Sequence, residues 1–109
     1  MKTENDAKGG VIETAAEVET KPPLFPRGLL VLKKGVREKL PFTEVVAGLT
    51  RHTLGDWGNL DALDRRHNEN GLHHGGRLWS AFRASNGVKF WILTKGDRSV
   101  TTVLLPRRN

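Results

Sequence analysis

The sequence contains no cysteine among its 109 residues. A disulfide scaffold, a thiolate zinc site and a cysteine nucleophile are therefore excluded. No apolar run approaches the roughly 18 residues that a membrane-spanning helix needs, so no membrane partner is expected. The polar start Met1–Gly10 is not followed by the apolar segment of a secretory signal. We therefore expect a cytoplasmic protein.

Apolar residues are scarce as well, at 37% of the chain, whereas 28% of the residues are charged. This composition predicts that part of the chain lacks a packed core. We assign residues 1–26 to a disordered acidic tail, because glycines and prolines interrupt them and they have no apolar face. Residues 27–109 then form a single small domain.

The net charge of +6 is distributed unevenly along the chain. Residues 1–26 hold three basic and five acidic side chains, whereas residues 27–109 hold 15 basic and seven acidic ones, a net charge of +8. Such a basic excess favours a polyanionic partner, with nucleic acid first. The alternative is that the charge only aids solubility.

The order of apolar patterns predicts an α+β fold: a short leading strand, two helices, then a three-stranded antiparallel β-meander. Apolar residues between Phe42 and Leu49 recur at helical spacing. Asp61 is a suitable N-cap for the second helix, and Gly71 a suitable residue after its end. The expected elements are strands at 28–32, 77–84, 88–94 and 99–105, one helical turn at 36–40, and helices at 42–52 and 61–70.

The dipeptide Asn86-Gly87 predicts a two-residue hairpin turn, because a type I′ turn needs positive φ at both central positions. This turn places Phe82 opposite Trp91. The predicted core face carries Trp79, Ala81, Val88, Phe90, Ile92, Val103 and Leu105. The predicted second face carries Leu78, Ser80, Phe82, Lys89, Trp91, Leu93, Val100, Thr102 and Leu104.

The second face is too apolar for a sheet face that contacts only water. One interpretation is a nucleic-acid platform, in which Phe82 and Trp91 stack bases while Lys89 and Arg98 neutralise phosphates. The alternatives are that other elements of the chain cover the face, or that it joins two copies in a homodimer. Both a monomer and a homodimer therefore stay open.

Histidines at positions 52, 67, 73 and 74 lack the spacing of metal ligands, so no metal or other cofactor is expected. His52 ends a predicted helix, where an imidazolium would suit the helix dipole. A metal-independent ribonuclease would need an acid–base group and cations, for which His52, Arg77, Arg98 and Thr102 are weak candidates.

The loop Gly55-Asp56-Trp57-Gly58 is the least ordinary local feature of the sequence. Its glycines permit a tight turn. We expect Trp57 to anchor the loop by burial, while Asp56 bonds backbone amides or a nearby arginine. The alternative is that this loop contacts a ligand.

Several of these segments together resemble a family of small bacterial proteins that plasmids and other mobile elements carry. The resemblance covers about residues 27–106 and implies no catalytic residues. Its more specific motifs are Gly55-Asp56-Trp57-Gly58 and Asp97-Arg98-Ser99-Val100-Thr101-Thr102, and Trp91-Ile92-Leu93-Thr94 and Leu104-Leu105-Pro106 also belong to it.

The leading hypothesis is a small accessory protein of a mobile element that binds nucleic acid or a host complex that handles nucleic acid. The first alternative is a metal-independent ribonuclease of toxin type, a class that shares the order of helices and strands. The second is a protein-binding inhibitor of a host defence system, which would use the apolar sheet face.

Overall fold

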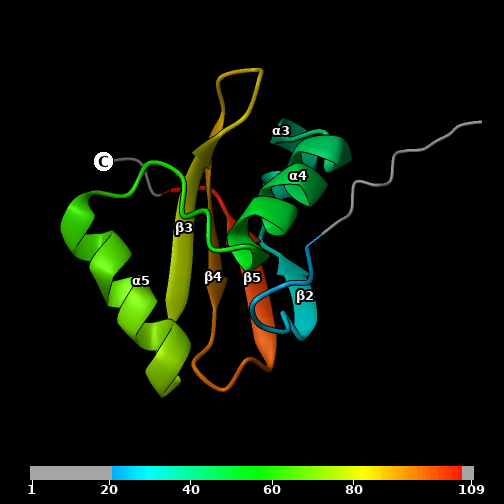
Figure 1. Ribbon diagram of the computed structural model, residues 1–109. Helices are drawn as coiled ribbons and strands as arrows, with labels where there is room; N and C mark the ends of the chain where they lie inside the picture. The colour runs from blue at the N-terminus through cyan, green and yellow to red at the C-terminus, as the bar shows by residue number, and fades with distance from the viewer. Residues whose placement is uncertain (1–20, 107–109) are drawn as a thin grey trace, which may run out of the picture.

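The structure is a computed structural model, and it describes residues 21–106. These residues form an α+β fold of three helices and a four-stranded sheet (Figure 1). The elements are β2 (Leu29–Leu32), α3 (Val36–Lys39), α4 (Phe42–Thr53), α5 (Ala62–His74), β3 (Leu78–Arg83), β4 (Lys89–Thr94) and β5 (Val100–Leu104). Most of the predicted acidic tail and the final residues 107–109 lie outside the described residues.

The sheet has the strand order β2-β5-β4-β3. The last three strands form the expected antiparallel meander. The prediction was incomplete in one respect, because β2 joins the same sheet in parallel with β5 and makes it a mixed sheet. The apolar side chains of Leu30 and Leu32 explain this pairing, since they pack on the core beside Val103.

The hairpin between β3 and β4 differs from the prediction by one residue. Ala84 donates its N–H to the Val88 carbonyl, so the loop has three residues rather than two. Of the three loop residues, only Gly87 has a positive φ, 88°, and three-residue hairpin loops typically end in a residue of this conformation. Phe82 therefore pairs with Phe90 instead of Trp91. Because side chains alternate along a strand, this shift moves every β3 side chain to the other face.

The inner face of the sheet carries the main core. Helices α3 and α4 cover it, and α4 comes close because it has a glycine at position 48: a Cβ there would lie 2.8 Å from the Phe90 ring. Phe90, Ile92 and Val103 lie on this face as predicted. From β3 the inner residues are Leu78, Ser80 and Phe82, so the prediction for Trp79 and Ala81 was wrong.

A smaller core cluster lies where α5, β3 and the end of α4 meet. It contains Phe25, Trp57, Leu60 and Leu78. Phe25 is only 5% exposed, so packing begins before the predicted boundary at residue 27. Helix α5 begins as expected, since the Asp61 carboxylate accepts a hydrogen bond from the Asp64 N–H at 2.9 Å. It stands beside β3, apart from α3 and α4 (Figure 1).

Within residues 21–106, no helix has the length and apolar character to cross a membrane.

Candidate functional site

The outer face of the sheet is the side opposite α3 and α4, and no element of residues 21–106 covers its centre. Most of its apolar side chains are half-buried, and none of them is fully buried. A contiguous apolar face that stays accessible to solvent is a typical binding surface. The half-buried residues of this outer face are Val31, Trp79, Ala81, Trp91, Leu93, Val100, Thr102 and Leu104.

Two tryptophans lie side by side on the outer face. Trp79 on β3 and Trp91 on β4 are diagonal neighbours in the register, and their ring centroids are 5.1 Å apart with an interplanar angle of 68°. This edge-to-face arrangement is a favourable geometry for two aromatic rings. Both rings are half-buried, so part of each indole remains available to a ligand.

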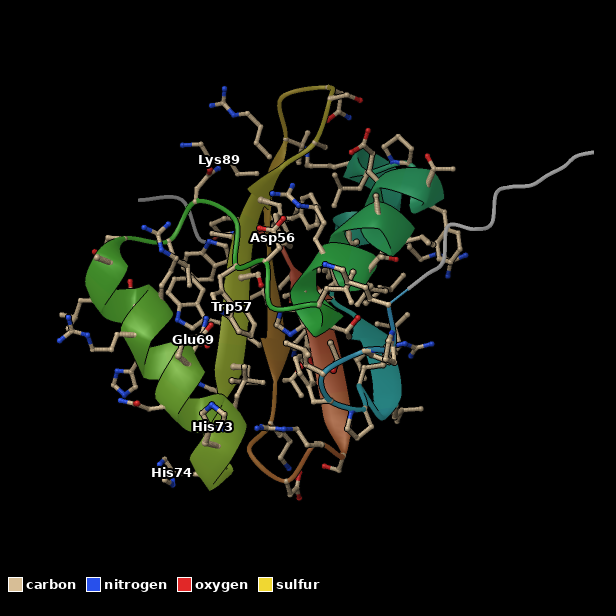
Figure 2. All side chains as sticks on the ribbon, viewed as in Figure 1. Asp56, Trp57, Glu69, His73, His74 and Lys89 are labelled. Carbon is tan, nitrogen blue, oxygen red and sulfur yellow. The ribbon has the colours of Figure 1, made fainter. Side chains whose placement is uncertain are left out.

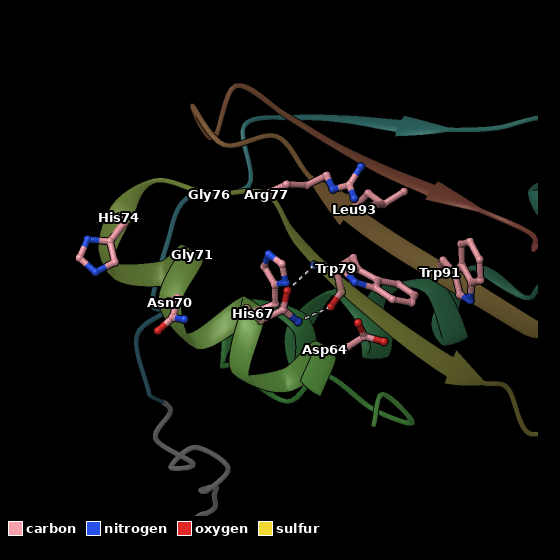
Figure 3. Close-up of a pocket in the computed structure, with 11 residues that line it drawn as sticks. Asp64, His67, Asn70, Gly71, His74, Gly76, Arg77, Trp79, Trp91 and Leu93 are labelled. Carbon is pink, nitrogen blue, oxygen red and sulfur yellow. Dashed lines mark hydrogen bonds between the residues drawn. The ribbon is translucent and has the colours of Figure 1, made fainter. Parts of the chain in front are cut away.

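A cavity of about 790 Å³ opens between α5 and the outer face (Figure 3). Trp79, Trp91 and Leu93 form its sheet side. Asp64 and His67 line it from α5 and point toward Trp79, whereas His74 points away (Figure 3). Arg77 lines the same cavity from the residue before β3.

A second hollow, of about 410 Å³, lies on the other side of Trp91. Lys33 and Lys34, which follow β2, line it together with Leu104 and Leu105. Trp91 therefore borders two hollows, one toward α5 and one toward the end of β2. The outer face thus has two adjacent depressions with one indole between them.

The backbone under Trp79 is held by a side chain of α5. Asn68 is almost fully buried, and its amide donates to the Trp79 carbonyl at 2.6 Å and accepts from the Trp79 N–H at 3.1 Å (Figure 3). The backbone groups of Ala81, the next ones to point toward this free edge, are also hydrogen-bonded. The Ala81 N–H donates to the Trp57 carbonyl, and the Ala81 carbonyl accepts from the Asn59 N–H. The free edge of β3 is thereby closed, and Trp79 has a fixed position.

Lys89 and Trp91 share the outer face, with Lys89 exposed at the hairpin end of the sheet (Figure 2). Phe82, predicted to stand beside them, is 4% exposed and lies on the inner face. The three-residue hairpin causes this difference. Trp79 takes the place on the outer face that the sequence analysis gave to Phe82, and the analysis missed it because the assumed register turned Trp79 inward.

Arg98, expected to contact phosphate, uses its guanidinium inside the protein. It donates to the carbonyl oxygens of Gly71 at 2.8 Å and Gly76 at 2.6 Å, at the C-terminal end of α5. Its φ of 63° is the only positive value of a residue other than glycine within residues 21–106. Arg98 therefore joins the turn before β5 to the end of α5.

His52 is fully buried between Ser80 and Thr94. Its Nδ1 lies 2.6 Å from the Ser80 hydroxyl and its Nε2 lies 2.9 Å from the Thr94 hydroxyl. Burial, and secondarily the positive charge of Arg98, lowers the pKa of His52 to about 4. The predicted charged imidazolium at the helix end is therefore wrong, because the buried ring is neutral at pH 7.

The four weak catalytic candidates do not form one group. His52 lies on the inner face, whereas Thr102 lies on the outer face of the same sheet. Arg77 lines the cavity beside α5, and Arg98 is bonded to backbone carbonyls. No acid–base pair arises from these residues.

The loop of Asp56 and Trp57 has the geometry of an anchor. Trp57 is 3% exposed, and its Nε1 donates to Glu69 Oε2 at 2.9 Å. Asp56 accepts from Arg51 Nε at 2.7 Å and from the Gly58 N–H. The hydrogen bond from Arg51 is the main reason that the pKa of Asp56 lies below its usual value.

Among residues 21–106, no group of three or more potential ligands is placed to hold a metal ion. Comparisons of the chain with protein-family models, with curated proteins and with solved structures find no match.

Proposed function

We propose that this protein binds single-stranded nucleic acid on the outer face of its sheet. The observation that carries the proposal is the pair of half-buried indoles, Trp79 and Trp91, on an open sheet face with a hollow on each side of Trp91. Unpaired bases stack on aromatic side chains of exposed sheets, and this contact accepts any base. The two hollows offer places for bases on either side of the Trp91 ring.

The charges around this face fit a phosphate backbone. Arg83 and Lys89 are direct partners in the β3–β4 register and both point outward, where two like charges repel each other. A phosphate placed between them would remove that repulsion. Lys33 and Lys34 stand at the β2 side of the face, and Arg77 stands beside the cavity.

The resemblance to proteins of mobile elements supports the wider role of a small accessory protein in such an element. The proposal includes a host complex that handles nucleic acid as a partner, since the strand bound to that complex would meet the same face. In either case the outer face contacts the single-stranded nucleic acid directly.

Binding of fluorescently labelled 12-nucleotide single strands, RNA and DNA, measured by anisotropy at low salt, tests the proposal. Loss of one base stack is worth about 1–3 kcal/mol, so Trp91→Ala should weaken binding by about 5- to 150-fold. The matched control is Phe42→Ala, because Phe42 is an aromatic residue on α4 that is 63% exposed, away from the outer face. That variant should bind as the wild type does.

Absence of binding to any single strand at low salt would contradict the proposal. The outer face, which includes the 66% exposed Leu29, would then be better explained as a protein interface. Shortening of the RNA during incubation, abolished by His67→Ala in the cavity, would instead support the ribonuclease alternative.

A further inference from the structure

We infer that the cavity between α5 and the two tryptophans takes one guanine base of the bound strand, with Asp64 as the residue that distinguishes it. This inference rests on the proposed function and adds a base preference to it. It depends on the shape of the cavity, on its indole walls and on the Asp64 carboxylate, to which no described residue donates a hydrogen bond.

The cavity has the size and the walls of a site for a planar ring. Its volume of about 790 Å³ falls in the range of about 300–1,000 Å³ that is typical of small-molecule sites. Two indoles supply the apolar contact, and the double hydrogen bond from Asn68 to the backbone of Trp79 holds one of them in place. A base that enters would therefore meet a fixed aromatic wall.

Asp64 supplies hydrogen-bond acceptors at the edge of this cavity. Its side chain is partly buried, and no described residue donates a hydrogen bond to its carboxylate or forms an ion pair with it. Five of the other six acidic residues in the described part of the chain do form such contacts, which are Glu44, Asp56, Asp61, Glu69 and Asp97. Among residues 21–106 the Asp64 carboxylate is thus an acceptor without a donor, and it lines the same cavity as the two indole rings.

An ionised carboxylate only accepts hydrogen bonds, and its two oxygens can accept two parallel ones. Guanine presents two adjacent donors, N1–H and N2–H₂, on its Watson–Crick edge. Adenine and cytosine present one amino group beside an acceptor, and uracil presents one N–H between two acceptors. The carboxylate therefore matches guanine and leaves a lone pair facing an acceptor with each of the other bases.

The charge of Asp64 supports a role in base recognition over a role in backbone contact. A carboxylate repels phosphate, so on a surface that only contacted the backbone it would weaken binding. Arg77 lines the same cavity and brings a positive charge close to the strand, which offsets this repulsion. Asp64 is thus the repulsive element and Arg77 the attractive one, and such a combination allows a site to discriminate between ligands.

The test uses 8-nucleotide oligouridines with one central guanosine, adenosine, cytidine or inosine, and the full-length protein. A bidentate contact to a base is worth about 1–3 kcal/mol of discrimination, so guanosine should bind about 5- to 150-fold more tightly than adenosine. Inosine lacks the N2 amino group and should fall between them. This comparison needs no protein variant, so it does not depend on the folding of one.

Asp64→Asn should reduce the preference for guanosine to within about twofold and leave binding to plain oligouridine equal or tighter. Glu38→Gln is the matched control, because it removes one negative charge on α3, away from the outer face. It should preserve the preference. Equal binding of all the oligonucleotides, or a guanosine preference that survives Asp64→Asn, overturns this inference and leaves the proposed function standing. Failure of every strand to bind overturns the proposed function together with it.

Discussion

At the scale of single residues, the carbonyl oxygen of Arg27 determines which nitrogen of His52 carries the proton. Thr101 must donate its hydroxyl proton to that carbonyl, at 2.6 Å, because a carbonyl only accepts. Thr94, 2.7 Å from Thr101, must then donate to it. The Thr94 oxygen is left to accept from His52 Nε2–H, and Ser80 donates to Nδ1. One carbonyl thus orders four buried side chains.

This arrangement predicts a loss of stability in mild acid. His52 has a pKa of about 4 in the folded protein, below its usual 6.5, so the unfolded chain binds the proton first. The contribution of the neutral ring is complete above pH 6.5 and decreases as the pH falls toward 4. The free energy of unfolding should drop by about 3 kcal/mol across that window. Urea unfolding at a series of pH values measures this decrease.

Two variants separate this effect from other titrations. His52→Gln should lower the stability at pH 7 but flatten the dependence between pH 6.5 and 4. His67→Gln changes an exposed histidine and keeps His52, so the decrease should persist in that variant. Asp56 and Asp97 have pKa values held below 3.8 by hydrogen bonds, chiefly from Arg51 and Ser99, so their contribution is lost mainly at lower pH. A wild-type curve that stays level down to pH 4 would contradict the assignment.

At the scale of elements, α5 serves as the cover of the β3 edge. An unpaired edge strand invites pairing with other chains, and Asn68 prevents this by bonding both polar groups of the Trp79 backbone. Asn68→Leu keeps the approximate size but leaves that N–H and C=O without partners. We expect a loss of about 2–4 kcal/mol in the free energy of unfolding, measured with urea.

The exposed Asn70, two residues further along α5, provides the control for this experiment. Asn70→Leu should change the stability by less than about 0.5 kcal/mol, as surface substitutions usually do. If the two leucine variants are equally stable, water replaces the Asn68 bonds and the edge does not depend on them.

The elements themselves were largely predictable from the sequence, whereas the register between β3 and β4 was not. Apolar spacing identified α4, and alternation identified the faces of β4 and β5. The Asp61 N-cap identified the start of α5, but the predicted end before Gly71 was wrong, because the helix continues to His74 and Gly75 is its C-cap. Asn86-Gly87 is compatible with a two-residue and with a three-residue loop. β3 carries large apolar side chains on both faces, Leu78 and Phe82 inward and Trp79 outward, so alternation does not select between the two registers.

The candidate site was predictable only in part for the same reason. Trp91 and Lys89 were placed on the outer face, but their aromatic neighbour is Trp79 and not Phe82. Asn68 stands in a nearly continuous polar stretch of α5, where no pattern marks it as buried. The partner of β2 was equally hidden, because a short apolar run indicates a strand but not the strand beside it.

At the scale of the whole molecule, most acidic side chains within residues 21–106 accept hydrogen bonds from other described residues, whereas most basic side chains there make no such contact. Residues 21–106 contain 14 basic and seven acidic residues. Five of the acids accept hydrogen bonds within the protein, yet the described residues form a single ion pair, Arg51 with Asp56. Most of the positive charge therefore has no ion-pair partner among the described residues, and part of it surrounds the outer face.

This distribution predicts a salt dependence that can be assigned to particular lysines. Each phosphate contact with a single strand contributes about −0.7 to the slope of log K against log salt concentration. Contacts from four of the five basic residues around the outer face, which are Lys33, Lys34, Arg77, Arg83 and Lys89, would therefore give a slope of about −3. Lys34→Gln and Lys89→Gln should each make that slope shallower by about 0.7. Lys39→Gln is the control, because this exposed residue lies on α3, which covers the inner face, and it should leave the slope unchanged. Binding titrations between low and physiological salt measure all four proteins. A slope near zero, or an equal change for Lys39→Gln, would show that the phosphates do not follow the outer face. A shallower slope for the two outer-face variants alone would instead place the phosphates along the line from Lys34 past Trp91 to Lys89.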